Sequence, residues 1–271
     1  MVRLVFVDVD GTLVGKEGVP ECVWPAVEAL RAKGIRLSLI TGRPGQGHAL
    51  AYARKLDPMG LHVFESGAVV LALSRDPHSP PAHSLLVEAL PQEAAREAIR
   101  LARRLGLPLE GYTAEGGFYV EGESPLFLAH QELLGLRAEG ADLLHLPSPL
   151  VRLQVLAGPE APLGAFLDRL PPGLSPHMAE SPKMPGVRFV SLTKKGVSKL
   201  SAARFVAEAY GLGLEACAMV GDGENDLELL RAVGLGVAMG NAPESVRKAA
   251  QRVVAPVEAC GLAEALLGLL G

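Results

Sequence analysis

Short apolar runs that end abruptly in a polar turn most limit what this chain can fold into. Three runs have this character: residues 4–7, 35–40 and 217–220. The continuous apolar run at 4–7 indicates a strand that is buried on both faces. Helical spacing follows these runs at 23–33, 47–56 and 224–232, and repeated strand–helix units imply a mostly parallel sheet with right-handed crossovers. The sequence therefore predicts an α/β fold.

Two proline-rich stretches, 74–83 and 171–185, interrupt this pattern. Neither fits a helix or a strand, so we expect both to be hinges. The helices and strands expected between them are arranged differently, in the manner of an α+β domain. We therefore expect a core domain built from residues 1–80 and 186–271, with an inserted α+β cap domain over 81–185.

Composition excludes several classes of protein. Hydrophobic residues make up 49% of the 271 residues and charged residues 21%, which is typical of a globular protein. The net charge of −4 argues against nucleic-acid binding, and no apolar run is long enough to cross a membrane. The cysteines, Cys22, Cys217 and Cys260, are few and scattered, which predicts reduced thiols and a cytoplasmic location.

The first motif is DVDGTL at residues 8–13, directly after the first apolar run. Ligands of open α/β sheets bind outside the carboxyl ends of the strands, where this motif would lie. Asp8 and Asp10 would repel each other there unless a positive group joined them. The alternative is structural, with one aspartate capping a turn and the other starting an Asp-Gly turn.

The second motif is GDGEND at residues 221–226, after another buried run. Mg²⁺ prefers oxygen ligands and often takes one or two protein carboxylates, which Asp8 and Asp222 could supply. The alternative is a helix N-terminus, where acidic residues are favoured by the helix dipole. That alternative explains Glu224 and Asp226 but does not require Asp222.

Two weaker signals accompany these motifs. Thr41 and Gly42 end the second run, and a hydroxyl beside a backbone N–H can hold a phosphoryl oxygen; a simple helix cap would have the same sequence. Lys199 falls in the first turn of a helix, which is the unfavourable end for a cation. Some anion should therefore compensate Lys199, unless it is a solvated surface lysine.

Together the four signals resemble the haloacid dehalogenase-like hydrolase superfamily, whose motifs are an acidic DxDGT/L, a threonine, a lysine and GDxxND. The length of the insert and the GVAMGNA segment at 236–242 are similar to the large-cap (C2) Cof-type sugar phosphatases. The resemblance implies a Rossmann-like core with an inserted cap. One departure is Ser66, which stands where the family usually has asparagine before Gly-Ala.

The resemblance also implies roles for individual residues. Asp8 would be the nucleophile, Asp10 the general acid and base, and Lys199 the cation that neutralises Asp8 and the transferring group. Mg²⁺ would be held by Asp8, Asp222 and the backbone carbonyl of Asp10. Asp226 would orient Lys199 or a metal-bound water. Phosphoryl and substrate oxygens would be held by Val9, Thr41, Gly42, Arg43 and Asn225.

The expected function is thus a Mg²⁺-dependent phosphomonoesterase that acts on small soluble phosphate esters. Sugar phosphates are the expected substrates by family analogy only. A phosphomutase and a non-catalytic phosphosugar-binding module remain alternatives, whereas Asp10 and the metal site disfavour a dehalogenase. Ionic cap residues, namely Arg152, His177 and Lys183, could contact substrate, although such residues are more often solvated.

Overall fold

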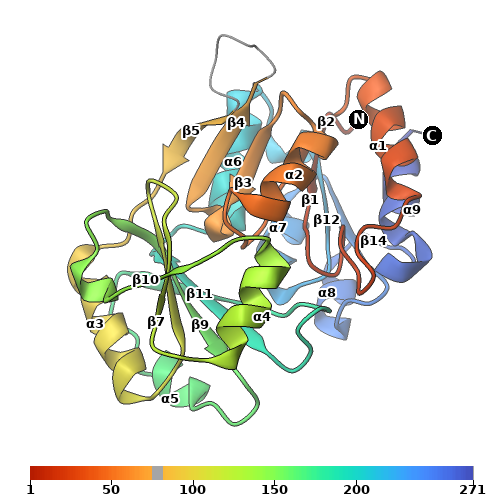
Figure 1. Ribbon diagram of the computed structural model, residues 1–271. Helices are drawn as coiled ribbons and strands as arrows, with labels where there is room; N and C mark the ends of the chain where they lie inside the picture. The colour runs from red at the N-terminus through yellow and green to blue at the C-terminus, as the bar shows by residue number, and fades with distance from the viewer. Residues whose placement is uncertain (75–81, 271) are drawn as a thin grey trace.

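A five-stranded parallel sheet forms the centre of the molecule (Figure 1), in the order β14-β13-β12-β1-β2. The computed structural model describes residues 1–74 and 82–270. Each pair of neighbouring strands in this sheet is parallel, which confirms the α/β class predicted from the apolar runs. The strands are β1 (Leu4–Val7), β2 (Arg36–Leu39), β12 (Cys217–Gly221), β13 (Leu235–Ala238) and β14 (Arg252–Val253).

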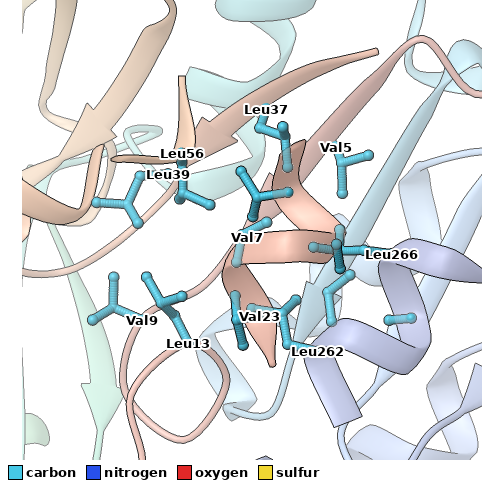
Figure 2. Close-up of a cluster of buried hydrophobic side chains, with 14 of the residues drawn as sticks. Val5, Val7, Val9, Leu13, Val23, Leu37, Leu39, Leu56, Leu262 and Leu266 are labelled. Carbon is cyan, nitrogen blue, oxygen red and sulfur yellow. The ribbon is translucent and has the colours of Figure 1, made fainter. Parts of the chain in front are cut away.

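Helices cover both faces of this sheet because successive strand residues point to opposite sides. Val5 and Val7 of β1 belong to one buried cluster, which Figure 2 shows together with side chains of β2 and α9. Leu4 and Phe6 belong to the cluster on the other face. The first face is covered by α1 (Val23–Ala32), α2 (Gly47–Leu56) and α9 (Gly261–Leu267). The second is covered by α6 (Lys199–Ala209), α7 (Leu227–Ala232) and α8 (Glu244–Ala249).

A three-stranded antiparallel sheet extends the core beyond β2. It contains β3 (Leu61–Phe64), β4 (Val69–Leu73) and β5 (Ala82–Val87), and a parallel bridge between Ile40 and Val63 joins it to the end of β2. Most of the linker expected over 74–83, including the expected boundary at 80/81, lies outside the described residues. The end of that stretch is the beginning of β5, which pairs with β4.

The inserted region is built on a six-stranded, largely antiparallel sheet in the order β10-β11-β9-β6-β7-β8. One face packs against α3 (Gln92–Arg104) and α5 (Leu163–Leu167), and the other against α4 (Pro125–Leu134). The strands are β6 (Leu109–Thr113), β7 (Phe118–Glu121), β8 (Glu139–Gly140), β9 (Leu150–Ala157), β10 (Leu174–Ala179) and β11 (Arg188–Lys194).

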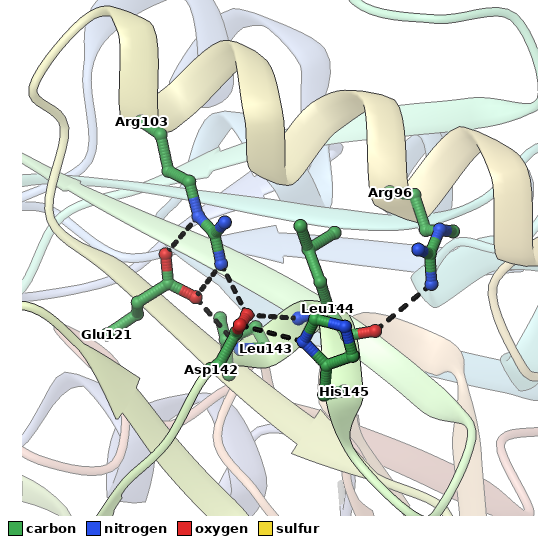
Figure 3. A network of polar contacts seen from close by, with 7 residues as sticks. All are labelled: Arg96, Arg103, Glu121, Asp142, Leu143, Leu144 and His145. Carbon is green, nitrogen blue, oxygen red and sulfur yellow. Dashed lines mark hydrogen bonds and ion pairs between the residues drawn. The ribbon is translucent and has the colours of Figure 1, made fainter.

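A polar network at the surface joins α3 to this sheet (Figure 3). The Arg103 guanidinium donates to the carboxylates of Glu121 and Asp142, the latter at 2.5 Å. Nearby, Arg96 Nη1 donates to the carbonyl oxygen of Leu144 at 3.0 Å. Arg103 is more than a third exposed, so solvent screens these ion pairs and their contribution to stability is modest.

The second proline-rich stretch is not the hinge that the sequence predicted. A strand, β10, forms within 171–185 at the edge of the sheet, where Pro176 lies opposite Leu192. An edge strand tolerates proline because its missing N–H can face away from the neighbouring strand. The strand expected at 187–192 also forms, as β11, but it pairs with β9 and β10. We therefore propose that the insert lies between β5 and α6, a shift of both expected domain boundaries.

The cysteines also differ from the expectation of reduced thiols. Cys22 and Cys260 form a disulfide across 238 positions of sequence, while Cys217 is free and buried. The bond lies where α1 and α9 run side by side (Figure 1). Among the described residues, no helix has the length and apolar character that a membrane span requires. The cytoplasmic location stays a prediction.

Candidate active site

Three carboxylates meet where β1 and β12 end. Parallel pairing sets Val7 beside Val220, so the residues that follow these strands are brought to one edge of the sheet. Carboxylate oxygens of Asp8, Asp222 and Asp226 all lie within 4.8 Å of one another. The sequence predicted this meeting from the two acidic motifs.

The close approach of these segments requires a glycine at position 11. Gly11 has a φ of +81°, and a Cβ built there would lie 2.0 Å from Asp222 Oδ2. Any other residue would be strained at this φ and would also push the Asp222 carboxylate away. The turn that carries Asp8 and Asp10 can therefore approach the turn that carries Asp222 this closely only because residue 11 is glycine.

Lys199 is the cation at the centre of this acidic group. Its Nζ donates to Asp8 Oδ1 at 2.6 Å and to Asp226 Oδ1 at 2.7 Å, and its side chain is 3% exposed. Burial alone would lower the pKa of Lys199, but the charges of Asp226 and Asp8 raise it above its usual value. The anion that a lysine in the first turn of α6 requires is thus present, while the side chain of Ser198 caps the helix.

Lys199 does not balance the charge of the cluster. Burial raises the pKa of Asp8 to about 7, and the charge of Asp226 adds to the rise while Lys199 opposes it. Burial and the nearby charges of Asp8 and Asp226 also raise the pKa of Asp222 well above its usual value. Crowded oxygen donors with excess negative charge suit a hard cation such as Mg²⁺.

Two further residues hold Asp222 in place. Thr12 Oγ1 donates to Asp222 Oδ1 at 3.0 Å, and Asn241 Nδ2 donates to Asp222 Oδ2 at 3.2 Å. Asn241 Nδ2 also donates to the Gly11 carbonyl at 2.9 Å, while Asn241 Oδ1 accepts from the backbone N–H of Val257. Asn241 therefore ties both acidic turns to the C-terminal segment.

Asp10 lies beside the cluster but has separate partners. The Arg43 Nε and Nη2 atoms donate to its two oxygens at 2.8 Å each, and Ser181 Oγ donates to Oδ1 at 2.8 Å. Burial alone would raise the pKa of Asp10, but Arg43, Ser181 and His130 lower it below its usual value. Arg43, expected to hold phosphoryl or substrate oxygens, therefore has its guanidinium on Asp10 in this structure.

The other residues that were predicted to hold phosphoryl oxygens differ in how far their side chains are buried. Thr41 is 1% exposed and its Oγ1 accepts from the backbone N–H of Arg43, while Thr41, Gly42 and Asn225 line the cavity at the site. The Val9 side chain is fully buried, so only its backbone could serve a ligand. Val9 O already accepts from the backbone N–H of Leu13.

The cavity above Asp8 has a volume of about 730 Å³ and lies between the core and the insert. Its insert-side lining includes Arg152, Gln154, His177 and Ser191. Lys183, the third ionic cap residue considered from the sequence, is not among the lining residues. The cavity is large enough for a small phosphorylated metabolite.

Comparison with known proteins shows which family this chain is similar to. A family model for haloacid dehalogenase-like hydrolases matches residues 163–266. A solved sugar phosphatase of HAD subclass IIB superposes over 99% of both chains with a TM-score of 0.84 at 23% sequence identity. The chain is thus similar to the haloacid dehalogenase-like hydrolases in sequence over residues 163–266, and it has the fold of a solved member over almost its whole length. The predicted Cof-type assignment and the phosphatase class are confirmed with it.

Alignments with several relatives cover nearly the whole of both chains. A putative phosphatase of Haemophilus influenzae is 28% identical over 265 residues, which cover 97% of this chain and 96% of the relative. A phosphoglycolate phosphatase of Methanopyrus kandleri is 27% identical, with 100% and 98% of the two chains covered. A solved phosphatase from Bacteroides thetaiotaomicron is 25% identical, with a TM-score of 0.79 over 99% of this chain and 95% of that one.

Sequence reasoning on this hydrolase missed the roles of Asn241 and Ser181. Asn241 lies in the GVAMGNA segment, which supported the family resemblance but received no role of its own. Ser181 lies in the proline-rich stretch that we read as a hinge. No local signal marks Ser181, because its contact with Asp10 depends on how the insert lies against the core.

Proposed function

We propose that this hydrolase is a Mg²⁺-dependent phosphomonoesterase that acts through an aspartyl-phosphate on Asp8. One observation carries the proposal: the Asp8 carboxylate is held by Lys199 and lies within 4.8 Å of two further carboxylates, at the floor of an open cavity. A buried carboxylate held by a lysine on one oxygen keeps its other oxygen available as a nucleophile.

The donor set supports Mg²⁺ as the cation. Asp8 and Asp222 offer carboxylate oxygens, and the backbone carbonyl of Asp10 would complete the protein ligands. Both oxygens of Asp222 are already oriented by hydrogen bonds from Thr12 and Asn241, as metal-binding carboxylates commonly are. Bound Mg²⁺ would offset the repulsion between the Asp8 carboxylate and a phosphate dianion.

Each remaining residue then has a role in the two steps. Asp8 forms a bond to phosphorus as the ester oxygen leaves, and Asp10 gives that oxygen a proton. The Asp10 carboxylate next takes a proton from the water that hydrolyses the intermediate; such acid–base help contributes on the order of 10²–10⁴-fold. Lys199 offsets charge on Asp8, and Asp226 holds Lys199 in place. The oxygens of the transferred phosphoryl group would contact Thr41, Gly42, Asn225 and the backbone of Val9.

We propose small phosphorylated metabolites, with sugar phosphates first among them, as the substrates. The insert-side wall of the cavity carries amide, hydroxyl and guanidinium groups from Gln154, Ser191 and Arg152, which can hydrogen-bond a polyhydroxy group. The structural neighbour named as a sugar phosphatase and the relatives named as phosphoglycolate phosphatases support this class of small esters.

The deciding experiment measures inorganic phosphate released from a panel of phosphomonoesters, with Mg²⁺ and with excess chelator. We expect release from at least one sugar phosphate with Mg²⁺, loss of release with chelator, and none with Asp8→Asn. An acid-quenched, phosphorylated protein should be found in the wild type and not in Asp8→Asn. Full activity with chelator would contradict the metal role, and isomer interconversion without phosphate release would indicate a phosphomutase.

A further inference from the structure

Residues 256–260, called here the C-terminal turn, are hydrogen-bonded to groups that adjoin both acidic turns of the site. The backbone N–H of Val257 donates to Asn241 Oδ1 at 2.9 Å. The backbone N–H of Lys16, in the segment that follows the first acidic motif, donates to Glu258 Oε1 at 2.6 Å. Val257 and Glu258 also line the cavity above the site. A movement of the C-terminal turn would therefore be felt at the carboxylates.

The contact with Val257 decides which way the Asn241 amide faces. An amide side chain has a donor end and an acceptor end of nearly equal shape. Because Oδ1 accepts from Val257, Nδ2 faces the carbonyl oxygen of Gly11 at 2.9 Å and Asp222 Oδ2 at 3.2 Å. The reversed amide would set its oxygen against two oxygens that can only accept. The C-terminal turn thus controls a hydrogen bond to Asp222, a proposed ligand of Mg²⁺.

Cys260 ends this turn in an unfavourable backbone conformation. Its φ is +63°, in the left-handed region that residues other than glycine rarely adopt. Its N–H donates to the carbonyl oxygen of Val257 at 3.2 Å, and its own carbonyl accepts from the N–H of Glu264 in α9 at 3.0 Å. A change of conformation at Cys260 would therefore move the contact between Val257 and Asn241.

The disulfide with Cys22 fixes Cys260 from another part of the core. Cys22 directly precedes α1, which packs along α9. Both cysteines are partly exposed rather than buried. A strained residue keeps its conformation only where its surroundings hold it. While the bond is intact the Cys260 side chain cannot leave α1, and once it is broken Cys260 is free to leave the left-handed region.

We propose that the Cys22–Cys260 disulfide makes the affinity of the site for Mg²⁺ depend on the oxidation state of the two cysteines. The inference rests on the proposed function, in which Asp222 holds Mg²⁺. The intact bond keeps the C-terminal turn against Asn241, which keeps Asp222 oriented. A dithiol breaks the S–S bond by exchange and leaves two protein thiols and the cyclic disulfide of the reductant. The reduced chain retains every ligand of Mg²⁺ but binds the cation more weakly.

The test measures the dissociation constant of Mg²⁺ by calorimetric titration of the metal-free protein, oxidised or fully reduced with dithiothreitol. Loss of a contact that orients a metal ligand costs about 10–100-fold in affinity, so we expect reduction to raise this constant about tenfold. Circular dichroism well below the melting temperature checks that both forms are folded. A disulfide that only stabilised the fold would lower the melting temperature and leave the dissociation constant unchanged. That result would overturn the inference.

Cysteine variants control for effects of the reductant itself. Cys22→Ser should bind Mg²⁺ as weakly as the reduced wild type and should not respond to dithiothreitol. Cys217→Ala is the matched control, because Cys217 is free and takes no part in the bond. It should respond to reduction as the wild type does. A Cys22→Ser variant with the affinity of the oxidised wild type would contradict the inference.

Asn241→Ala tests whether the effect passes through Asn241. We expect the oxidised variant to bind Mg²⁺ about tenfold more weakly than wild type, and reduction to add little to this loss. A full response to reduction in Asn241→Ala would overturn the proposed route. An oxidised wild type that binds no Mg²⁺ would contradict the proposed function itself, whereas equal affinity of the oxidised and reduced wild type would show that the inference alone is wrong.

Discussion

Two buried polar clusters each contribute residues to the lining of the same cavity and differ in how their charges are balanced. The core cluster consists of Asp8, Asp222, Asp226 and Lys199, with three carboxylates around one lysine. The insert cluster consists of Arg152, Glu110 and His130 together with Glu65 of the core.

The side chains of the insert cluster pair with one another. Arg152 pairs with Glu65 and lies over the Tyr112 ring at 3.8 Å, while the hydroxyl of Tyr112 donates to Glu110. His130 Nδ1 lies 2.9 Å from a Glu110 oxygen. The core cluster sets three carboxylates against one lysine, and burial together with their mutual repulsion raises the pKa of Asp8 and of Asp222. Burial also raises the pKa of Glu65 in the insert cluster, although Arg152 opposes that rise. Every charged side chain of the insert cluster has a partner within it, whereas in the core cluster three carboxylates share one lysine and can accept a further cation.

The largest expected effect comes from breaking the insert cluster. Arg152→Leu leaves Glu65 buried without its partner, and loss of one partner of a buried ion pair costs about 3–5 kcal/mol. We expect the free energy of unfolding, measured by chemical denaturation, to fall by that amount. The double variant Glu65→Leu/Arg152→Leu should recover much of the loss, because it removes both charges. Equal stability of wild type and Arg152→Leu would show that the pair is not needed.

Breaking the core cluster should affect turnover first. Lys199→Met removes the cation bonded to Asp8 and Asp226, and loss of one such electrostatic contact lowers kcat by about 10²–10³-fold. The measurement is phosphate release at saturating substrate and Mg²⁺. Lys194→Met is the matched control, because Lys194 is exposed and pairs with Glu88 away from the site. Wild-type turnover in Lys199→Met would remove Lys199 from the proposed mechanism.

The same difference in charge predicts which cluster responds to a divalent cation. Mg²⁺ at one hundred times its dissociation constant should stabilise the fold by about 2.7 kcal/mol, seen as a rise in the melting temperature. Asp222→Asn should abolish most of this rise, because it removes a carboxylate of the core cluster. Arg152→Leu should keep it. A rise of the same size in Asp222→Asn and wild type would place the cation elsewhere.

The last prediction is a pH dependence of stability in the metal-free protein. The pKa of Asp8 is raised from 3.8 to about 7, so the folded state keeps a proton that the unfolded state loses. The free energy of unfolding should therefore fall as pH rises from about 4 to about 7. Comparison with Asp8→Asn isolates this group, since the fall should be smaller there, where Asp222 with its raised pKa remains. A rise of wild-type stability relative to Asp8→Asn over this range would contradict the expected sign.

The sequence predicted the core cluster and could not predict the insert cluster, for a physical reason. The motif residues of the core directly follow buried strands. Parallel pairing of β1 with β12 brings these residues together, and this pairing does not depend on how the insert packs against the core. The insert cluster joins Glu65 to Arg152, which are 87 positions apart and meet only through domain packing. The contact between Ser181 and Asp10 depends on that packing in the same way.

Local signals explain which elements were predicted well. Helix α4 has clear local end signals, because the Ser124 side chain caps it, Pro125 starts it and Gly135 ends it in the left-handed conformation. Strand β10 was missed because proline normally argues against a strand, and the exception needs knowledge that β10 is at an edge. The disulfide was missed because Cys22 and Cys260 meet through the packing of α1 on α9.

That disulfide makes the chain, from Cys22 to Cys260, a covalent ring in which the whole insert is a loop. A protease that cuts the insert once would open the ring without separating the two halves of the core. Such a nicked molecule would run as one species on a non-reducing gel and as two fragments once reduced. The strand and turn that carry Asp8 would therefore stay tethered to those that carry Asp222 after the connection between them through the insert is cut.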